Sequence, residues 1–193
     1  MEPTRRVVVD VTFLEMRHPP REQALPLPAG WSIELEKSPT VPLYRMLHDR
    51  IGRDYCWWMR QVKSDADLKA ILDQPGRSLF LLKEGDDIRG FCEFEKRPYK
   101  TINLAYFGLM PEMIGRGIGR IFLSHALSLA WLLHPQRVTV NTCTADHPRA
   151  LPGYLKAGFR IVGVVRENWD VPLRLKLPAP KYLAPKYIGR FVE

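Results

Sequence analysis

The sequence has few of the features that mark secreted or metal-bound proteins. Its 193 residues include three cysteines, Cys56, Cys92 and Cys143, an odd number with no CxxC spacing. This argues against a disulfide framework or a zinc site and for reduced, mostly buried thiols. The N-terminal stretch MEPTRRVVVDVTFLEM has charges inside its apolar run and lacks a small-residue cleavage site, so it is not read as a secretion signal. These absences predict a cytoplasmic protein without a bound metal.

Long hydrophobic runs are also missing. The most apolar stretch, Ile121 to Leu133, is about 13 residues long and is interrupted by Ser124, His125 and Ser128. A helix needs roughly 20 apolar residues to cross a bilayer. We therefore expect no membrane partner.

The composition is that of a globular protein with one domain: 46% of residues are apolar, 26% charged and 10% aromatic. The net charge of +8 favours an anionic partner, which could be a phosphorylated cofactor, an acidic substrate or nucleic acid. The basic, tyrosine-bearing C-terminal tail has no recognised groove-reading motif, so nucleic acid is the unlikely choice among the three.

The order of the expected elements places a helix between two strands that follow a meander. Strands are expected over residues 5–16, 33–36, 78–84, 88–96, 101–110, 137–144 and 160–168, and helices over 42–53, 64–72, 118–134 and 148–157. The three strands from residue 78 to 110 are spaced as an antiparallel meander, whereas the helix between Leu109 and Val138 indicates a right-handed crossover between parallel strands. The prediction is an α+β fold with a mixed, mostly antiparallel central sheet and flanking helices.

The domain prediction is one unit over residues 1–170, in which residues 1–30 form a strand and a proline-rich loop. Four prolines in Val171 to Pro185 and the repeated APKY predict that residues 171–193 form an extended arm.

The stretch IGRGIGR, Ile114 to Arg120, carries three glycines at alternate positions between an expected strand and an expected helix. Such glycines allow close backbone approach, and amides at a helix start form an anion site. A dinucleotide GxGxxG motif would need glycine where Arg120 stands, and the GxxxxGK[ST] pattern of a P-loop is absent. Both nucleotide motifs are therefore disfavoured, although a phosphate remains the natural ligand.

Two separated motifs resemble those of the GNAT superfamily of N-acetyltransferases. The loop is similar to the family's acyl-coenzyme A signature, Q/R-x-x-G-x-G/A, with Gly117 and Gly119 at the glycine positions and Ile114 departing from the first. The later stretch DHPRALPGYLKAGF resembles the family's second segment, a short helix with a tyrosine and a terminal Gly-Phe pair; Tyr154, Gly158 and Phe159 match it. The resemblance covers about residues 78–168 and implies a GNAT-like sheet with a splayed parallel strand pair.

The resemblance also implies a cofactor site for acetyl-CoA, the acyl donor. The end of the strand before the loop would bind pantetheine, the loop amides would bind the pyrophosphate, and three further residues lie near the point where the parallel strands separate. The expected cofactor-binding residues are therefore Phe107, Gly108, Leu109, Met110, Gly115, Arg116, Gly117, Ile118, Gly119, Arg120, Asn141, His147 and Tyr154. Tyr154 would donate a proton to the departing thiolate. Its other interpretation is a core aromatic residue at a helix seam.

The general base is left open by the sequence. Glu93 and Glu95 alternate with apolar residues on one strand, so both point to one face, which is either the acceptor cleft or solvent. Asn141 and His147 are the alternatives. The aromatic residues Tyr55, Trp57 and Trp58 fall where the acceptor wall is expected, or they belong to the core.

The leading hypothesis is an N-acetyltransferase that moves an acetyl group from acetyl-CoA to a primary amine of a small molecule or protein by direct attack. The alternative is a GNAT-like CoA-binding sensor or interaction module without turnover. A homodimer is a candidate assembly.

Overall fold

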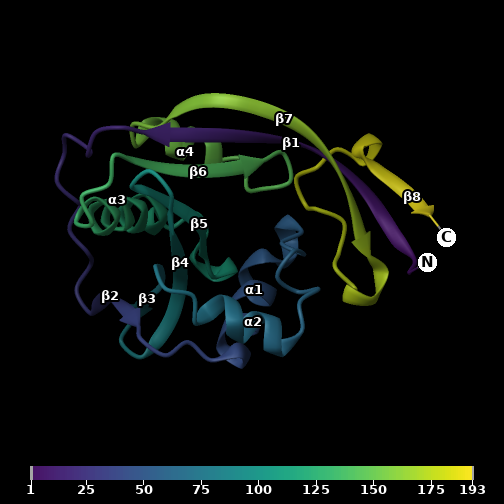
Figure 1. Cartoon of the computed structure of the whole chain (residues 1–193), viewed down its shortest axis with the longest axis horizontal. Helices are drawn as coiled ribbons and strands as arrows, with labels where there is room; N and C mark the ends of the chain where they lie inside the picture. Colours follow the sequence, from purple (N-terminus) through teal and green to yellow (C-terminus); the bar gives the residue numbers. More distant parts are fainter. Residues whose placement is uncertain (1, 193) are drawn as a thin grey trace.

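The protein folds into one central sheet with helices on both of its faces (Figure 1). The computed structural model describes residues 2–192. The strands are β1 (Thr4–Met16), β2 (Trp31–Glu36), β3 (Arg77–Glu84), β4 (Asp87–Arg97), β5 (Thr101–Leu109), β6 (Arg137–Cys143), β7 (Arg160–Pro172) and β8 (Ile188–Val192). The helices are α1 (Val41–Gly52), α2 (Asp65–Leu72), α3 (Ile118–Trp131) and α4 (Ala150–Lys156), with short 3-10 turns η1 (Arg53–Tyr55), η2 (Pro111–Met113), η3 (Leu173–Leu175) and η4 (Pro185–Tyr187).

The strand order is β2-β3-β4-β5-β6-β1-β7, and β8 pairs with β1 off this path. β5 and β6 are parallel, joined through α3, and the other paired strands are antiparallel. The predicted mixed, mostly antiparallel sheet with a parallel pair is therefore confirmed. The sequence alone did not indicate that the first strand of the chain lies between β6 and β7.

Local sequence explains where the helices begin. Thr40 caps α1, and its side chain accepts a hydrogen bond from the Leu43 amide. Ser64 and Asp67 form a capping box at α2, which satisfies two amides at the helix start. α3 has no such side-chain cap and begins instead at Gly117, which has a φ of 80°.

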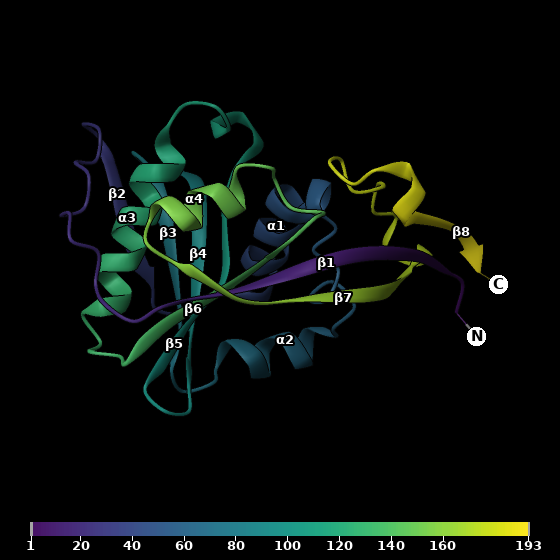
Figure 2. The same ribbon diagram turned by 90° about the horizontal axis from the view of Figure 1, so that it is seen from above.

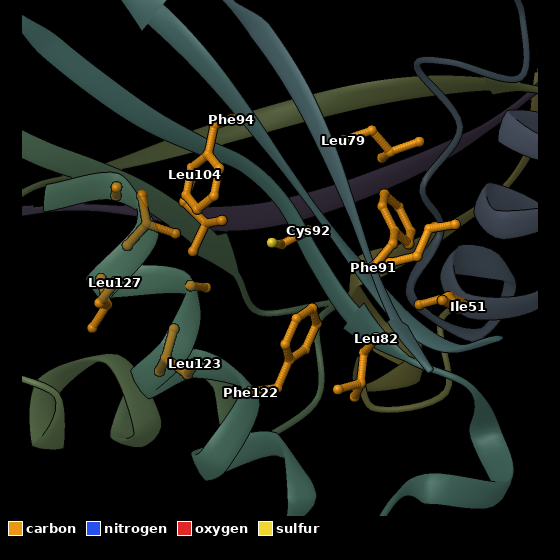
Figure 3. Close-up of a cluster of buried hydrophobic side chains, with 14 of the residues drawn as sticks. Ile51, Leu79, Leu82, Phe91, Cys92, Phe94, Leu104, Phe122, Leu123 and Leu127 are labelled. Carbon is orange, nitrogen blue, oxygen red and sulfur yellow. The ribbon is translucent and has the colours of Figure 1, made fainter. Parts of the chain in front are cut away.

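The main core lies between the sheet and the helices on its two faces. Phe122, Leu123 and Leu127 of α3 face Cys92, Phe94 and Leu104 of the sheet, while Ile51 of α1 lies beside Phe91 on the other face (Figure 3). Because side chains alternate along a strand, successive residues of β4 serve the two faces in turn. Burial of these apolar side chains fixes where α1 and α3 lie relative to β5.

A two-stranded ribbon extends from the sheet beyond β6. β1 pairs with β6 only from Val11 to Met16 but pairs with β7 from Thr4 to Glu15, and β8 joins β1 near the N-terminus (Figure 1). A second cluster of buried apolar side chains lies under this ribbon and includes Val7, Val9, Cys56, Leu177 and Leu183. The C-terminal segment thus folds back against the residues that follow α1.

Candidate active site

The parallel strands β5 and β6 separate halfway along their length. They are paired only over residues 101–104 and 137–140, after which β6 turns away from β5 (Figure 2). On its other side β5 shifts register against β4, since Glu93 is opposite Tyr106 and Phe94 is opposite Leu104, which makes Ala105 the extra residue of a bulge. The separation opens a cleft of about 1550 Å³ between the two strand ends.

One end of the cleft is formed by backbone. Gly115 and Gly117 have φ values of 87° and 80°, a region that favours glycine, and a side chain at either position would point into open space. Within residues 2–192 their amides have no hydrogen-bond acceptor, and no side chain caps α3. Unpaired amides at the start of a 14-residue helix form an anion site.

The structure brings most of the expected cofactor-binding residues to this cleft. The residues of that set that line it are Phe107, Gly108, Leu109, Gly115, Gly117, Gly119, Arg120, Asn141, His147 and Tyr154. Met110 and the Ile118 side chain are buried in the core instead, although the Ile118 amide lies at the helix start. The Arg116 side chain is exposed and is not part of the cleft lining.

Tyr154 lies in the wall between the strand ends and is 7% exposed. Its ring contacts those of Phe107 and Phe159, and within the described chain its phenol oxygen has no hydrogen-bond partner. Burial, with smaller contributions from Asp146 and Cys92, raises the pKa of Tyr154 above its usual value, so the phenol is protonated at neutral pH. The side chain is therefore a proton donor with no competing partner.

Glu93 and Glu95 point to the same face of β4, as the alternation predicted, but both are in ion pairs. Glu93 is fully buried, accepts a 2.6 Å hydrogen bond from the Tyr44 hydroxyl, and pairs with Arg77 and, at 3.5 Å, with Arg60. Its carboxylate does not line the cleft. Glu95 lines the cleft and pairs with Arg77 at 3.3 Å and with an arginine further along β4 at 3.0 Å.

Both alternative bases line the cleft, Asn141 within β6 and His147 in the turn that follows it. Asn141 is exposed and lies opposite Phe13 of β1. His147 Nδ1 accepts a hydrogen bond of 3.1 Å from the Arg149 amide. Partial burial, Arg149 and Lys181 lower the pKa of His147, which favours its neutral form.

The comparisons with known proteins agree with this geometry. The family model described as "Acetyltransferase (GNAT) family" matches residues 41–159. The chain belongs to this family. A comparison with curated proteins found no match.

Solved structures of GNAT proteins share the fold at low sequence identity. A GCN5-related N-acetyltransferase from Sphaerobacter thermophilus is 18% identical with a TM-score of 0.57, over 88% of this chain and 54% of that one. A GNAT family acetyltransferase from Elizabethkingia anophelis with acetyl-CoA bound is 18% identical, with a TM-score of 0.54 over 70% and 80% of the two chains. Spermidine N-acetyltransferase from Vibrio cholerae, in complex with CoA and spermine, is 15% identical, with a TM-score of 0.56 over 75% and 97%. The present chain spans about half the length of the Sphaerobacter protein.

The other end of this GNAT cleft is formed by side chains. Tyr55, Trp57 and Trp58 line it, as does Trp169 of β7. Tyr182 of the C-terminal segment stacks on Tyr55 with ring centroids 6.1 Å apart. These aromatic residues come from three distant parts of the chain, and the sequence reasoning named only those of the first.

Asp146 is the residue at this end that the sequence reasoning missed. Its carboxylate lines the cleft and accepts hydrogen bonds from Trp57 Nε1 at 3.2 Å, Thr142 Oγ1 at 2.7 Å and the Cys143 amide at 3.0 Å. Asp146 directly precedes His147 in the second GNAT-like motif, which was the one available signal.

Membrane and metal features complete the description of residues 2–192. No helix in this range is long and apolar enough to cross a membrane. No group of three or more His, Cys, Asp or Glu side chains in the same range could hold a metal ion.

Proposed function

We propose that this GNAT protein transfers an acetyl group from acetyl-CoA to a primary amine of a small molecule or protein. The observation that carries the proposal is the single cleft that joins three features: unpaired glycine-loop amides, the opened end of β5 and the unpartnered phenol of Tyr154. The family match and the acetyl-CoA bound to the Elizabethkingia structure support the choice of acyl donor.

The residues fit the donor in two places, its pyrophosphate and its pantetheine. Amides of Gly115 to Arg120 would bind the pyrophosphate, and Arg120 adds positive charge at the cleft wall. The backbone of Phe107 to Leu109, beyond the last residue paired with β6, would bind the pantetheine. Acetyl-CoA supplies an activated thioester.

In the proposed reaction a neutral amine attacks the carbonyl carbon of the thioester. A carbon–nitrogen bond forms, the carbon–sulfur bond breaks, and Tyr154 gives its proton to the departing sulfur. The excess proton on the nitrogen returns through water to the tyrosine. Because Glu93 and Glu95 are held in ion pairs, we propose that water in the cleft accepts the proton that the ammonium loses before attack.

The test is release of free thiol from acetyl-CoA in the presence of a panel of amines and peptides, followed with a thiol reagent. We expect thiol release that depends on the amine and a product heavier by one acetyl group. CoA binding without turnover across the panel would instead support the sensor or interaction module.

We also propose a location and a domain organisation. The three free cysteines are in keeping with a reducing compartment, so we place the protein in the cytoplasm. We propose that residues 1–170 form one domain and that residues 171–193 form its arm.

We further propose a homodimer. Strand β7 lies at the edge of the described sheet and carries four exposed apolar residues, Ile161, Val162, Val164 and Val165. This favours a homodimer formed along the edge of β7, which light scattering can measure.

A further inference from the structure

The Asp146 carboxylate has no cationic partner among the side chains that the structure describes. Two of the other carboxylates that line the cleft, Glu15 and Glu95, are paired with arginines. Glu22, which is exposed in the proline-rich loop, and Glu167, which accepts a hydrogen bond from the Trp169 indole, also line it and form no ion pair among the described side chains.

Asp146 forms no ion pair with any side chain of residues 2–189, the range over which the structure describes side chains, although it is only partly exposed. Partial burial, Arg149 and Lys181 lower the pKa of the nearby His147, which favours its neutral form. A half-buried carboxylate without a counter-ion is costly, so this end of the cleft is suited to a ligand that brings a positive charge.

The hydrogen bonds of Asp146 fix its position and leave room for a ligand. Oδ2 accepts from Thr142 Oγ1 and the Cys143 amide, and Oδ1 accepts only from Trp57 Nε1. Each carboxylate oxygen can accept about two hydrogen bonds, so Oδ1 retains one lone pair. An ammonium group is a suitable donor for that position because it offers three N–H groups.

The surfaces around Asp146 are aromatic. Trp57, whose indole donates to Asp146, and Tyr55, Trp58 and Trp169 all line the same cleft. The Trp169 indole is itself held by a hydrogen bond of 2.7 Å to Glu167. Aromatic faces attract cations and bury flat apolar groups.

This end of the cleft also lies within electrostatic reach of the proposed acid. After burial, the Asp146 carboxylate is the next largest cause of the raised pKa of Tyr154. It also contributes to the pKa of Tyr106, which burial raises to about 12, with Glu93 and Asp146 adding to the rise and Arg60 and Arg77 opposing it. Asp146 and Tyr154 line the same cleft, so a ligand held by Asp146 would share that cleft with the phenol that protonates the leaving sulfur.

We propose that Asp146 binds the ammonium group of the acceptor, and that the acceptor is a primary amine joined by a short linker to an aromatic or other flat apolar group. This inference rests on the proposed acetyl transfer and names its substrate class. Trp57 and Trp58 would enclose the apolar group, while Asp146 orients the nitrogen toward the opened end of β5.

The test measures binding without reaction, so that it does not depend on turnover. The protein is saturated with CoA, which carries no acetyl group, and titrated calorimetrically with 2-phenylethylamine and with its neutral isostere 2-phenylethanol. We expect the amine to bind at least tenfold more tightly than the alcohol, and ethylamine, which lacks the ring, at least tenfold more weakly than 2-phenylethylamine. Equal affinity for amine and alcohol in the natural protein would overturn the proposal, whatever the variants do.

Asp146→Asn removes the charge and keeps the shape. We expect it to bind amine and alcohol equally while CoA affinity stays within about twofold, which also shows that the variant is folded. Glu22→Gln is the matched control, because it removes a carboxylate from the cleft lining in the proline-rich loop and should leave the tenfold preference intact. An Asp146→Asn protein that still prefers the amine tenfold would contradict the proposal.

A second variant guards against misfolding of the first. Thr142→Val keeps the charge of Asp146 but removes one of its hydrogen bonds, and we expect a reduced preference for the amine that remains above twofold. The two proposals fail separately: a tenfold amine preference with no thiol release from acetyl-CoA would refute acetyl transfer alone. Thiol release with spermidine or peptides but not with 2-phenylethylamine would refute the substrate class alone.

Discussion

The two ends of the cleft differ in the groups that form them: backbone amides at one end and side chains at the other. At the donor end, backbone groups of one continuous segment, Gly115 to Gly119, present amides to an anion. At the acceptor end, side chains from three distant segments meet: the residues after α1, the end of β6 with its following turn, and β7. A site made of backbone depends on glycine conformation, whereas a site made of side chains depends on how the whole sheet is assembled.

This difference has a consequence for mutation. Replacing one side chain at the donor end should lower CoA affinity only slightly, because the backbone amides remain. Adding a side chain to one of its glycines should block the site. At the acceptor end the reverse holds, since each side chain supplies its own charge or aromatic face.

Gly117→Glu should abolish CoA binding. The added side chain would occupy the open space before α3, its charge would repel a pyrophosphate, and the φ of 80° would be strained. Titration calorimetry with CoA measures the loss.

The matched control is Gly30→Glu. Gly30 also has a φ of 80° and open space where a side chain would begin, and it lies outside the cleft, so the variant carries the same strain and charge. If both variants bind CoA equally well, or lose it equally, the glycine loop is not the donor site.

Tyr154→Phe should lower kcat by about a hundredfold, which is in the range of a lost general acid, while CoA affinity changes less than twofold. The phenylalanine ring preserves the contacts with Phe107 and Phe159. Single-turnover thiol release gives the rate, and an unchanged rate would remove Tyr154 from the chemistry.

Tyr182→Ala should raise the KM for the amine a fewfold without changing CoA affinity. The Tyr182 ring stacks on Tyr55, and its centroid lies 5.1 Å from that of the His147 ring. Its loss removes packing contacts from these two residues of the acceptor end and none from the glycine loop. Tyr99→Ala, at a residue 81% exposed and outside the cleft, is the control. A larger effect on CoA than on the amine would show that the two ends are not separate.

His48, which packs behind the cleft residues Trp57 and Tyr106, makes the stability of the fold sensitive to acid. It is buried among the rings of Tyr44, Trp57, Phe91 and Tyr106, and both ring nitrogens lack partners. Burial, with the charge of Arg60, lowers the pKa of His48 to about 3.

Below the unfolded pKa of about 6.5 the unfolded chain binds one more proton than the folded chain at His48. The stability that this residue contributes is thus present above pH 6.5 and falls by about 1.4 kcal/mol per pH unit as the pH drops toward 3. When the pH is lowered from 7 to 5, the free energy of unfolding of His48→Leu should therefore fall by about 2 kcal/mol less than that of the natural protein, as measured by urea unfolding. Parallel pH profiles for the two proteins would contradict this.

The donor end could be predicted from the sequence because its signal is local. Glycines at positions 115, 117 and 119 before an amphipathic helix directly indicate the backbone conformation of the loop. The order of the strands and helices followed from the periodicity of the apolar residues. The capping box at Ser64 is local in the same way.

The acceptor end could not be predicted because its signal is spread over the chain. The hydrogen bond between Trp57 and Asp146 joins residues 89 positions apart, and no local pattern encodes such a contact. The place of β1 between β6 and β7 is likewise set by pairing between residues about 150 positions apart. For the same reason alternation placed Glu93 and Glu95 on one face but could not indicate that Arg77 and Arg60 cover Glu93 there.

The most direct test of a cleft with a backbone-built donor end and a side-chain-built acceptor end is a crystal structure with CoA bound. The account predicts that the pyrophosphate lies within hydrogen-bonding distance of amides between Gly115 and Arg120, with the sulfur beside Tyr154 Oη and the space next to Asp146 left open. A CoA molecule whose phosphates lie among Trp57, Trp58 and Asp146 would contradict it.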